Sequence, residues 1–401
     1  METADLQPLL DNFQRKMASI PMDFKRYLYH QINWDNRIIC IKGERGVGKT
    51  TLLLQHIKQS NQPIDQVIYA SLDDLWFINH TLMELVDWAY LNDIKTLYLD
   101  EVHKMQNWTL YLKNIYDSYP NINVVYTSSS ILLMDNSKVD LSRRQVVYTL
   151  EGLSFREFLS FEGAGDFPVI QFDQLLTEHV KLATNICTKI KVIPLFNKYL
   201  SRGYYPFYKE VGDSFMQVLR ASTSLVIETD LPATETITFE TIHKTKMLLM
   251  VISENVPFTP NLSRLWQEIA ITNGLGLKLL YALDRSKLIY LLSPQTNNYK
   301  QLSKPGKIFL GNTNLMHALT VNVNRGNERE TFFANQVSVV TDVTMPNQGD
   351  FMVNNKYLFE VGGKKKSFDQ VKDFQNSFLA IDDTEIGFKN RIPLWMFGLL
   401  Y

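Results

Sequence analysis

The sequence has little that would place it among the specialised protein classes. Of its 401 residues only 2 are cysteine, Cys40 and Cys187, too few for a disulfide framework or an all-cysteine zinc site. Glycine (18) and proline (14) are sparse and no polar tract dominates, which excludes collagen-like and low-complexity chains. The composition is that of a globular protein, and its length predicts two or three domains.

The sequence also lacks an excess of charge of either sign. Lys and Arg number 41 and Asp and Glu 42, so no overall positive field draws the protein to nucleic acid or to an anionic membrane. No apolar run approaches the ~20 residues of a membrane span. Residues 1–12 lack the pattern of a signal peptide. We therefore expect a cytoplasmic protein without membrane contact.

The first third of the chain alternates short apolar runs with segments of helical length. Four runs are continuously apolar, as strands buried on both faces should be. They are residues 37–42, 66–69, 96–100 and 123–126. Helical spacing marks the segments between them, such as 51–60 and 108–116. This alternation predicts an α/β fold, a three-layer parallel sheet with crossover helices, over residues 1–152.

The middle of the chain predicts two further domains. Residues 153–235 hold long amphipathic segments without strand alternation, which predicts a helical lid or linker. The predicted helices there are 155–161, 175–197 and 215–229. Residues 236–305 contain three helical segments and then an apolar strand, which is the order of a winged helix. These segments are 241–254, 261–271, 277–287 and 288–292.

The last part of the chain, residues 306–401, predicts a separate small α/β domain. Its predicted elements are a helix at 328–337, hairpin strands at 350–353 and 356–361, and a helix at 368–379. The hairpin turns at Asn354-Asn355, a residue pair that suits a tight turn between strands.

Residues 43–50, Gly-Glu-Arg-Gly-Val-Gly-Lys-Thr, satisfy the phosphate-binding pattern G-x-x-x-x-G-K-[ST]. They follow an apolar strand and precede a helix, so backbone N–H groups of the loop and of the helix start can surround phosphate oxygens. We expect Lys49 to bridge the β- and γ-phosphates of ATP and Thr50 to ligate Mg²⁺. The predicted nucleotide-binding residues are Gly43, Glu44, Arg45, Gly46, Val47, Gly48, Lys49, Thr50, Thr51, Thr127 and Ser128.

Two acids end the apolar strand 96–100, and this pair distinguishes an ATP hydrolase from a simple nucleotide binder. We expect Asp100 to order the water shell of Mg²⁺ and Glu101 to act as general base. Thr127 and Ser128 follow the next strand, where they either hydrogen-bond the attacking water or γ-phosphate or cap a helix. His103 lies either near the nucleotide or at an exposed helix start.

Taken together, these residues resemble the AAA-domain ATPases of bacteria and archaea that carry a C-terminal restriction-endonuclease-like domain. The resemblance covers nearly the whole chain. Besides the P-loop, the matching segments are 99–103, 127–130, 141–144, 150–158, 199–206 and 359–364.

The resemblance implies a charge-stabilising arginine at Arg144, with Arg143 standing where the family has glycine. A guanidinium there can neutralise transition-state charge, either in the same chain or from a neighbouring subunit of a homo-oligomer. The alternative is a pair of surface arginines beside a strand.

The C-terminal part resembles the PD-(D/E)xK nuclease fold, in which a helix Glu and two hairpin acids hold a divalent metal beside a lysine. Glu330, Asp350 and Glu360 match the three acids and form a candidate second metal site. The position two residues after Glu360 is Gly362, and the first lysine is Lys364. This displacement favours a degenerate, structural or nucleic-acid-docking domain over an active nuclease.

Two roles for ATP hydrolysis stay open at this point. In the first, the protein acts on DNA, with Lys278, Arg285 and Lys287 of segment 277–287 in a major groove and Lys364–Lys366 on phosphates. In the second, the protein is a slow ATP-dependent switch that binds protein partners and has no DNA role.

Overall fold

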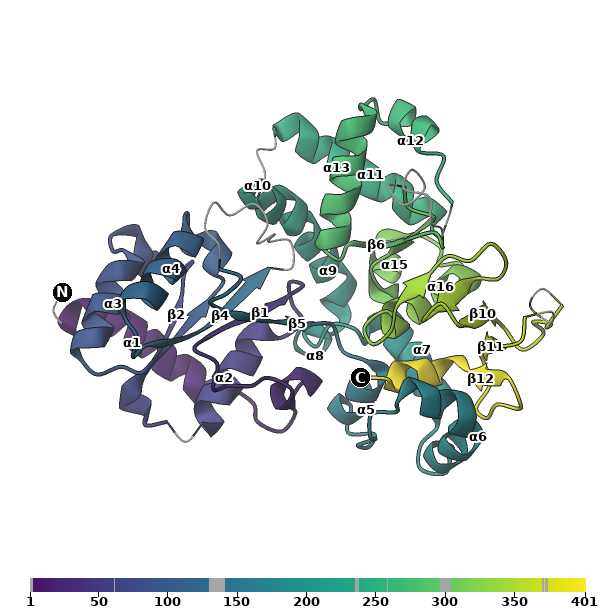
Figure 1. Cartoon of the computed structure of the whole chain (residues 1–401), viewed down its shortest axis with the longest axis horizontal. Helices are drawn as coiled ribbons and strands as arrows, with labels where there is room; N and C mark the ends of the chain where they lie inside the picture. Colours follow the sequence, from purple (N-terminus) through teal and green to yellow (C-terminus); the bar gives the residue numbers. More distant parts are fainter. Residues whose placement is uncertain are drawn as a thin grey trace. The chain divides into compact units, whose positions relative to one another are not determined.

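The computed structural model of the chain describes residues 3–60, 62–129, 141–234, 238–257, 259–295, 304–369, 371 and 374–401. The chain forms two compact units, which Figure 1 draws in one view. The first unit comprises Met1–Glu151 and Asp230–Thr236, and the second comprises Gly152–Thr229 and Ile237–Tyr401. The first predicted boundary lies after residue 152, whereas the first unit also takes in Asp230–Thr236, most of which falls in the predicted lid. The further division of 153–401 into three domains stays a prediction.

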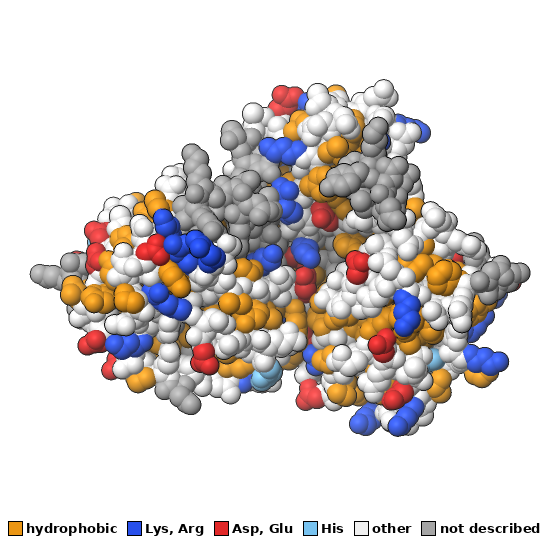
Figure 2. Space-filling model, viewed as in Figure 1, with side chains coloured by type: hydrophobic (Ala, Val, Ile, Leu, Met, Phe, Trp, Pro, Cys, Tyr) orange, Lys and Arg blue, Asp and Glu red, His pale blue; other side chains and the backbone are white. Residues whose placement is uncertain are grey.

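The surface of the chain carries charges of both signs. On the face drawn in Figure 2, Lys and Arg side chains are interspersed with Asp and Glu, in keeping with the formal net charge of −1. Among the described residues, no helix is both long enough and apolar enough to cross a membrane.

The first unit is built on a five-stranded sheet whose strands are all parallel. The strands are β1 (Ile38–Gly43), β2 (Val67–Ser71), β3 (Thr96–Asp100), β4 (Asn123–Ser129) and β5 (Val146–Leu150). Their order is β2-β3-β4-β1-β5, which confirms the predicted α/β fold. Because β4 lies between β1 and β3, the residues that end β4 lie between the P-loop and the acids that end β3.

The first unit also contains α-helices and short 3₁₀ turns. The helices are α1 (Thr3–Ser19), α2 (Lys49–Gln59), α3 (Leu82–Leu91), α4 (Trp108–Ser118) and α10 (Leu231–Thr234), with 3₁₀ turns at Tyr27–His30, Ile64–Gln66, Leu75–Ile78 and Val102–Lys104. Helix α3 begins with a capping box, in which the Thr81 hydroxyl accepts the backbone N–H of Glu84 and the Glu84 carboxylate accepts that of Thr81.

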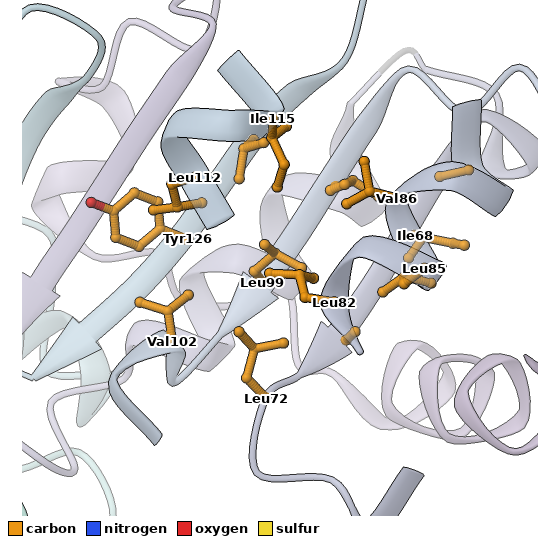
Figure 3. Packing of buried hydrophobic residues seen from close by; sticks show 14 of the residues in the cluster. Ile68, Leu72, Leu82, Leu85, Val86, Leu99, Val102, Leu112, Ile115 and Tyr126 are labelled. Atoms are coloured by element: carbon orange, nitrogen blue, oxygen red, sulfur yellow. The ribbon is translucent and has the colours of Figure 1, made fainter. Parts of the chain in front are cut away.

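The hydrophobic core of the first unit lies between the sheet and helices α3 and α4. Figure 3 shows Leu82 and Leu85 of α3 and Ile115 of α4 pointing toward Ile68 and Leu99 of the sheet. All five side chains are buried. Burial of each stabilises the fold by about 1.5–3 kcal/mol, so this packing holds the strand ends in place.

The second unit begins with helices only, as predicted. They are α5 (Phe155–Phe161), α6 (Phe172–Cys187), α7 (Val192–Arg202), α8 (Tyr208–Val211) and α9 (Phe215–Leu225), followed by a π-helical turn at Val226–Asp230. The single helix predicted at 175–197 is wrong, because α6 ends at Cys187 and α7 starts at Val192. Pro194 explains the break, since a proline has no N–H for helix bonding and clashes with the carbonyl four residues earlier.

Three helices and an antiparallel strand pair come next in the second unit. They are α11 (Phe239–Asn255), α12 (Leu262–Glu268), α13 (Asn273–Arg285), β6 (Ile289–Leu292) and β7 (Lys307–Leu310). This is the predicted order, and its reading as a winged helix stays an interpretation. The predicted boundary at 305 falls between β6 and β7, which pair with each other from Ile289 opposite Leu310.

The C-terminal part of the second unit holds a second five-stranded sheet, of mixed direction. Its strands are β8 (Val343–Thr344), β9 (Phe351–Val353), β10 (Tyr357–Gly362), β11 (Ser377–Ile381) and β12 (Arg391–Pro393), in the order β12-β11-β10-β9-β8. Its helices are α15 (Thr313–Leu319), α16 (Arg325–Val337) and a 3₁₀ turn at Leu394–Leu399.

One hairpin of this sheet confirms its prediction and one helix does not. Strands β9 and β10 pair antiparallel across Asn354 and Asn355, whose φ angles of 53° and 52° suit this turn. The helix predicted at 368–379 is wrong, because Ser377–Ile381 forms a parallel strand beside β10. The apolar residues at the end of the predicted helix instead form backbone hydrogen bonds with β10, and most of their side chains are buried.

The partly buried histidine of α2, His56, makes stability depend on pH. The His56 ring stacks on Trp34, with centroids 3.6 Å apart and planes 6° apart, and burial lowers the pKa of His56 to about 4. The unfolded state therefore takes up a proton more readily than the folded state as the pH falls from about 6.5 to 4. We expect wild type to lose stability over this range, and His56→Phe, which keeps the stacking, to lose about 1–3 kcal/mol less.

Urea unfolding at pH 7, 5.5 and 4 measures this difference. His30 is exposed, so His30→Phe serves as the control and should follow wild type. Parallel curves for wild type and His56→Phe would contradict the prediction.

Candidate active site

The loop between β1 and α2 needs its glycines for distinct reasons. Gly46 and Gly48 have φ angles of 83° and 97°, in the left-handed region that glycine adopts without strain. At Gly43, an added Cβ would lie 2.4 Å from the carbonyl oxygen of Leu150, so β5 can approach only a glycine there. The glycine pattern of the sequence therefore corresponds to a real constraint at each position.

Lys49 is the first residue of α2, and its ammonium lies against the loop itself. Its Nζ donates hydrogen bonds of 3.0 Å to the carbonyl oxygens of Gly43 and Glu44 and lies 4.0 Å from Oε1 of Glu101. The side chain is only 6% exposed. A buried positive charge is therefore held at the loop and helix N-terminus that the sequence predicts to bind phosphate.

Asp100, at the end of β3, accepts hydrogen bonds from three hydroxyl groups. Thr50 Oγ1 donates to Oδ2 at 2.7 Å, Tyr69 donates to the same oxygen at 2.8 Å, and Thr127 donates to Oδ1. Burial, with Asp100 adding to it, raises the pKa of Tyr69, so its hydroxyl stays a donor. The carboxylate is thus oriented from α2, β2 and β4 together.

The pair of Thr50 and Asp100 fits a magnesium ion. Thr50 Oγ1 and Asp100 Oδ2 lie 2.7 Å apart, so the two residues present a hydroxyl and a carboxylate oxygen at one point of the site. A hydroxyl and a carboxylate are ligands that Mg²⁺ accepts, and its other ligands usually come from phosphate and water.

Tyr69 and Lys16 belong to this site, although sequence reasoning missed both. Lys16 of α1 donates from Nζ to the Tyr69 hydroxyl at 3.0 Å. A hydroxyl within the apolar run of β2 is a signal that could have found Tyr69. No local pattern points to Lys16, which lies 53 residues away in the sequence.

Glu101 follows β3 in a left-handed backbone conformation, with φ 53° and ψ 42°. This turn lets its backbone N–H donate to Thr127 Oγ1 at 2.9 Å. Its Oε1 faces Lys49 at 4.0 Å, and its Oε2 lies 3.3 Å from Nε2 of His103. Burial raises the pKa of Glu101, and the ammonium of Lys49 opposes that shift.

Thr127 and Ser128 lie near the end of β4, between the loop and the acids. The Thr127 hydroxyl is fully buried and contacts Asp100 and the backbone of Glu101, while the Ser128 hydroxyl donates to the carbonyl of Ser129 at 3.3 Å. This geometry makes Thr127 an organiser of the two acids. Direct contact of either side chain with a nucleotide stays a prediction.

Asp230 and Arg26 also hold the loop region, and sequence reasoning found neither. Asp230 is 3% exposed, and its Oδ1 lies 2.9 Å from Lys104 Nζ and 4.0 Å from an Nη of Arg45. Arg26, also buried, donates to the carbonyl of Val47 and, at 2.6 Å, to that of Glu151. Both reach the loop from distant parts of the sequence.

Arg143 and Arg144 lie at the other end of the sheet. They precede β5, which runs parallel to β1 from Val146 opposite Ile39 to Leu150 opposite Gly43, a length of about 13 Å at ~3.3 Å per residue. Arg144 forms an ion pair of 3.1 Å with Asp117, and Arg143 is exposed. The register places both arginines away from the P-loop of the same chain, so action from a neighbouring subunit and a pair of surface arginines both stay open as predictions.

Two of the three C-terminal acids have lysine partners, and the third, Asp350, accepts the backbone N–H of Val361 at 2.8 Å. Lys307 Nζ lies 2.5 Å from Oε2 of Glu330, and Lys366 Nζ lies 2.5 Å from Oε2 of Glu360. Burial raises the pKa of both glutamates, and the nearby Asp350 adds to the rise. Across the described residues, no group of three His, Cys, Asp or Glu side chains is placed to hold a metal ion. The geometry therefore favours ion pairs over the expected second metal site.

The lysine that reaches Glu360 is Lys366, not Lys364, the first lysine after the strand. Lys364 and Lys365 are exposed, whereas the aliphatic part of Lys366 lies so close to Gly362 that an added Cβ would meet it at 2.8 Å. The missing side chain at Gly362 makes room for this later lysine. The lysine beside Glu360 is thus Lys366, two residues beyond the first lysine of the segment.

The positive charges of Arg285 and Lys287, at the end of α13, are partly balanced by the nearby carboxylate of Asp284. Asp284 accepts the backbone N–H of Leu291 at 2.9 Å, and burial raises its pKa while the charges of Lys287 and Arg285 oppose the rise. Only Lys278 of the three predicted DNA contacts is exposed. Less positive charge faces solvent here than the sequence suggests.

The left-handed turn at Glu101 costs stability. A residue with a Cβ pays about 1–2 kcal/mol in this conformation, whereas glycine does not. We expect Glu101→Gly to be about 1 kcal/mol more stable than Glu101→Ala, which keeps the strain. Urea unfolding of the two variants measures the difference, and equal stability would show that the turn is not strained.

The ion pair of Lys366 and Glu360 stabilises the second unit. We expect Lys366→Met to lower the free energy of unfolding by about 1–3 kcal/mol, because it leaves a buried carboxylate without its ammonium. Lys365→Met, at an exposed position, is the control and should change it by less than about 0.5 kcal/mol. Adding Mn²⁺ without nucleotide should leave the unfolding midpoint unchanged; a rise that Glu360→Gln abolishes would indicate a metal site.

Curated relatives of the chain are archaeal. It is 28% identical over 293 residues to uncharacterized protein MJ1637 of Methanocaldococcus jannaschii, a match covering 69% of this chain and 61% of the relative. It is 28% identical over 182 residues to uncharacterized protein MJ1544 of the same organism, covering 44% of this chain and 37% of the relative. The matched region thus spans less than two thirds of either relative.

Solved structures with some likeness include the replication initiator DnaA bound to AMPPCP and single-stranded DNA, with a TM-score of 0.27 and 16% identity over 70% of this chain and 88% of that one. AMPPCP-bound DnaA from Aquifex aeolicus has a TM-score of 0.28 and 15% identity over 70% and 87%. TM-scores this low support no conclusion about the chain. The model of the AAA domain family, in contrast, matches residues 35–159, the stretch that holds all five strands of the first sheet, the P-loop and both acids of β3.

Proposed function

We propose that this protein binds ATP and hydrolyses it with Mg²⁺. One observation carries the proposal: Lys49, Thr50, Asp100 and Glu101 meet at the carboxyl edge of the first sheet. Thr50 contacts Asp100 at 2.7 Å, and the ammonium of Lys49 lies 4.0 Å from the carboxylate of Glu101. The match of residues 35–159 to the AAA domain family supports the same function.

The P-loop and Lys49 bind the phosphates of ATP. When ATP enters, Lys49 exchanges the carbonyls of Gly43 and Glu44 for phosphate oxygens, which offer it a negative charge. Backbone N–H groups of the loop and the positive end of the α2 dipole complete the cradle. Thr50 and Asp100 would hold Mg²⁺, whose charge stabilises the negative charge on the transferred phosphoryl group.

Hydrolysis requires a base beside the γ-phosphate, and Glu101 has that role. Its carboxylate accepts a proton from water while the water oxygen bonds to the γ-phosphorus, and the bond from that phosphorus to the bridging oxygen breaks. ADP and inorganic phosphate leave. Thr127 supports both acids, because its hydroxyl contacts Asp100 and accepts the backbone N–H of Glu101.

A second candidate concerns what hydrolysis drives. The pairing of Lys366 with Glu360, and of Asp284 with the charges of Lys287 and Arg285, reduces the positive charge available for phosphates. This favours an ATP-dependent switch that binds protein partners over a DNA-directed machine. Lys278, Lys364 and Lys365 stay exposed, so these three lysines are the ones that DNA phosphates could contact.

The first test compares ATP hydrolysis and nucleotide binding in wild type, Lys49→Ala and Glu101→Gln. We expect Lys49→Ala to lose binding of a fluorescent ATP analogue. Glu101→Gln should keep binding and lose turnover by about 10²- to 10⁴-fold, because it cannot accept the proton. Lys42→Ala, on β1 ahead of the loop, is the control. Undiminished turnover in Glu101→Gln would refute the assignment of the base.

The second test adds double-stranded DNA at low and moderate salt. A switch for protein partners predicts an unchanged ATPase rate, within about twofold, at both salt concentrations. Stimulation by DNA that weakens with salt, and weakens again in the variant Lys364→Ala/Lys365→Ala, would instead support the DNA-directed role.

A further inference from the structure

His103 lies in the 3₁₀ turn directly after Glu101, and its imidazole is buried against the proposed base. Its side chain is 3% exposed, and Nε2 lies 3.3 Å from Oε2 of Glu101. On the other side of the ring, Nδ1 accepts the backbone N–H of Ser129, at the end of β4, at 3.4 Å. The ring thus lies between the ends of β3 and β4, at the carboxyl edge of the first sheet.

The contact with Ser129 determines where the ring carries its proton. A backbone N–H can only donate, so Nδ1 must present its lone pair. In the neutral imidazole the hydrogen then resides on Nε2, which makes Nε2 a donor 3.3 Å from Oε2 of Glu101. Burial lowers the pKa of His103 to about 4, in keeping with a neutral ring.

A hydrogen bond from Nε2 of His103 to Oε2 of Glu101 would lower the free energy of the site. Among the described residues, Nε2 has no hydrogen-bond partner of good geometry, and a buried donor without a partner costs about 1–3 kcal/mol. The neighbouring charges that act on the ring are Asp230, Lys104, Lys49 and Arg45. Three of these four are cations and cannot accept from Nε2, and Lys104 Nζ lies 2.9 Å from Asp230.

Nucleotide binding changes the partners of the Glu101 carboxylate. Without a nucleotide, Lys49 lies 4.0 Å from Oε1 of Glu101. A phosphate that draws the ammonium of Lys49 to itself takes this partner away from Oε1. His103 then holds Oε2, and Oε1 is left to accept a proton.

We propose that His103 is the positioning residue of the general base: its Nε2–H holds Oε2 of Glu101 so that Oε1 faces the attacking water. This inference rests on the proposed function, because it assigns a partner to the base of that reaction. His103 does not touch the reacting atoms and acts only through Glu101.

Two variants separate positioning from packing. In His103→Gln the amide nitrogen takes about the place of Nε2 and keeps a donor for Glu101. In His103→Leu the site stays filled, but no donor is present. We expect kcat to fall about 10- to 100-fold in His103→Leu and only a few-fold in His103→Gln. KM and the Kd of a fluorescent ATP analogue should stay within about threefold of wild type in both.

The double variant Glu101→Gln/His103→Leu tests whether His103 acts through Glu101. If it does, the double variant hydrolyses ATP no more slowly than Glu101→Gln alone, because no base is left to position. A purely structural histidine would lower the rate by the same factor in either background. Multiplying losses would therefore overturn the proposal, as would an unchanged kcat in His103→Leu.

A third variant covers the case in which His103→Leu does not fold. In His103→Asn the side-chain oxygen can still accept from Ser129, but the amide nitrogen is too far back to reach Glu101. We expect Asn to lower kcat as Leu does while Gln keeps it, and equal rates for Asn and Gln would overturn the proposal. Should Glu101→Gln itself keep full turnover, the assignment of the base fails, which is a different outcome.

Discussion

The carboxylate of Asp100 organises the carboxyl edge of the first sheet, where the proposed active site lies. Hydroxyl groups of Thr50, Tyr69 and Thr127 donate to it, so it joins β3 to α2, β2 and β4. A buried carboxylate requires such donors, since an isolated charge away from water costs several kcal/mol. The same bonds place Thr50 where a magnesium ion would need it, so the stability of this edge and its chemistry share one group.

The strand order explains why this contact exists at all. Strand β4 lies between β1 and β3, and Thr127 therefore stands between the P-loop and the two acids. It also accepts the backbone N–H of Glu101, which supports the left-handed turn there. Strain in the backbone of Glu101 is offset by hydrogen bonds from a neighbouring strand, as is common where a side chain must be aimed.

The second unit follows the same rule with ion pairs in place of hydroxyl groups. Asp382, 1% exposed, meets Arg325 at 2.9 Å and Arg329 at 2.8 Å. Glu360 and Glu330 have their own lysines. Asp382, Glu360 and Glu330 thus each have a cation beside the carboxylate, so two of the three acids that resemble a nuclease centre are held as ion pairs.

The sequence by itself determined the fold of the first unit and most of its proposed site. The P-loop, the buried strands and the acids at 100 and 101 follow from local rules, because glycine conformations, strand burial and helix starts depend on neighbouring residues. Contacts between distant residues were decided only in the tertiary structure. Lys16 beside Tyr69 and Asp230 beside Lys104 depend on where packing brings segments together, which no local pattern encodes.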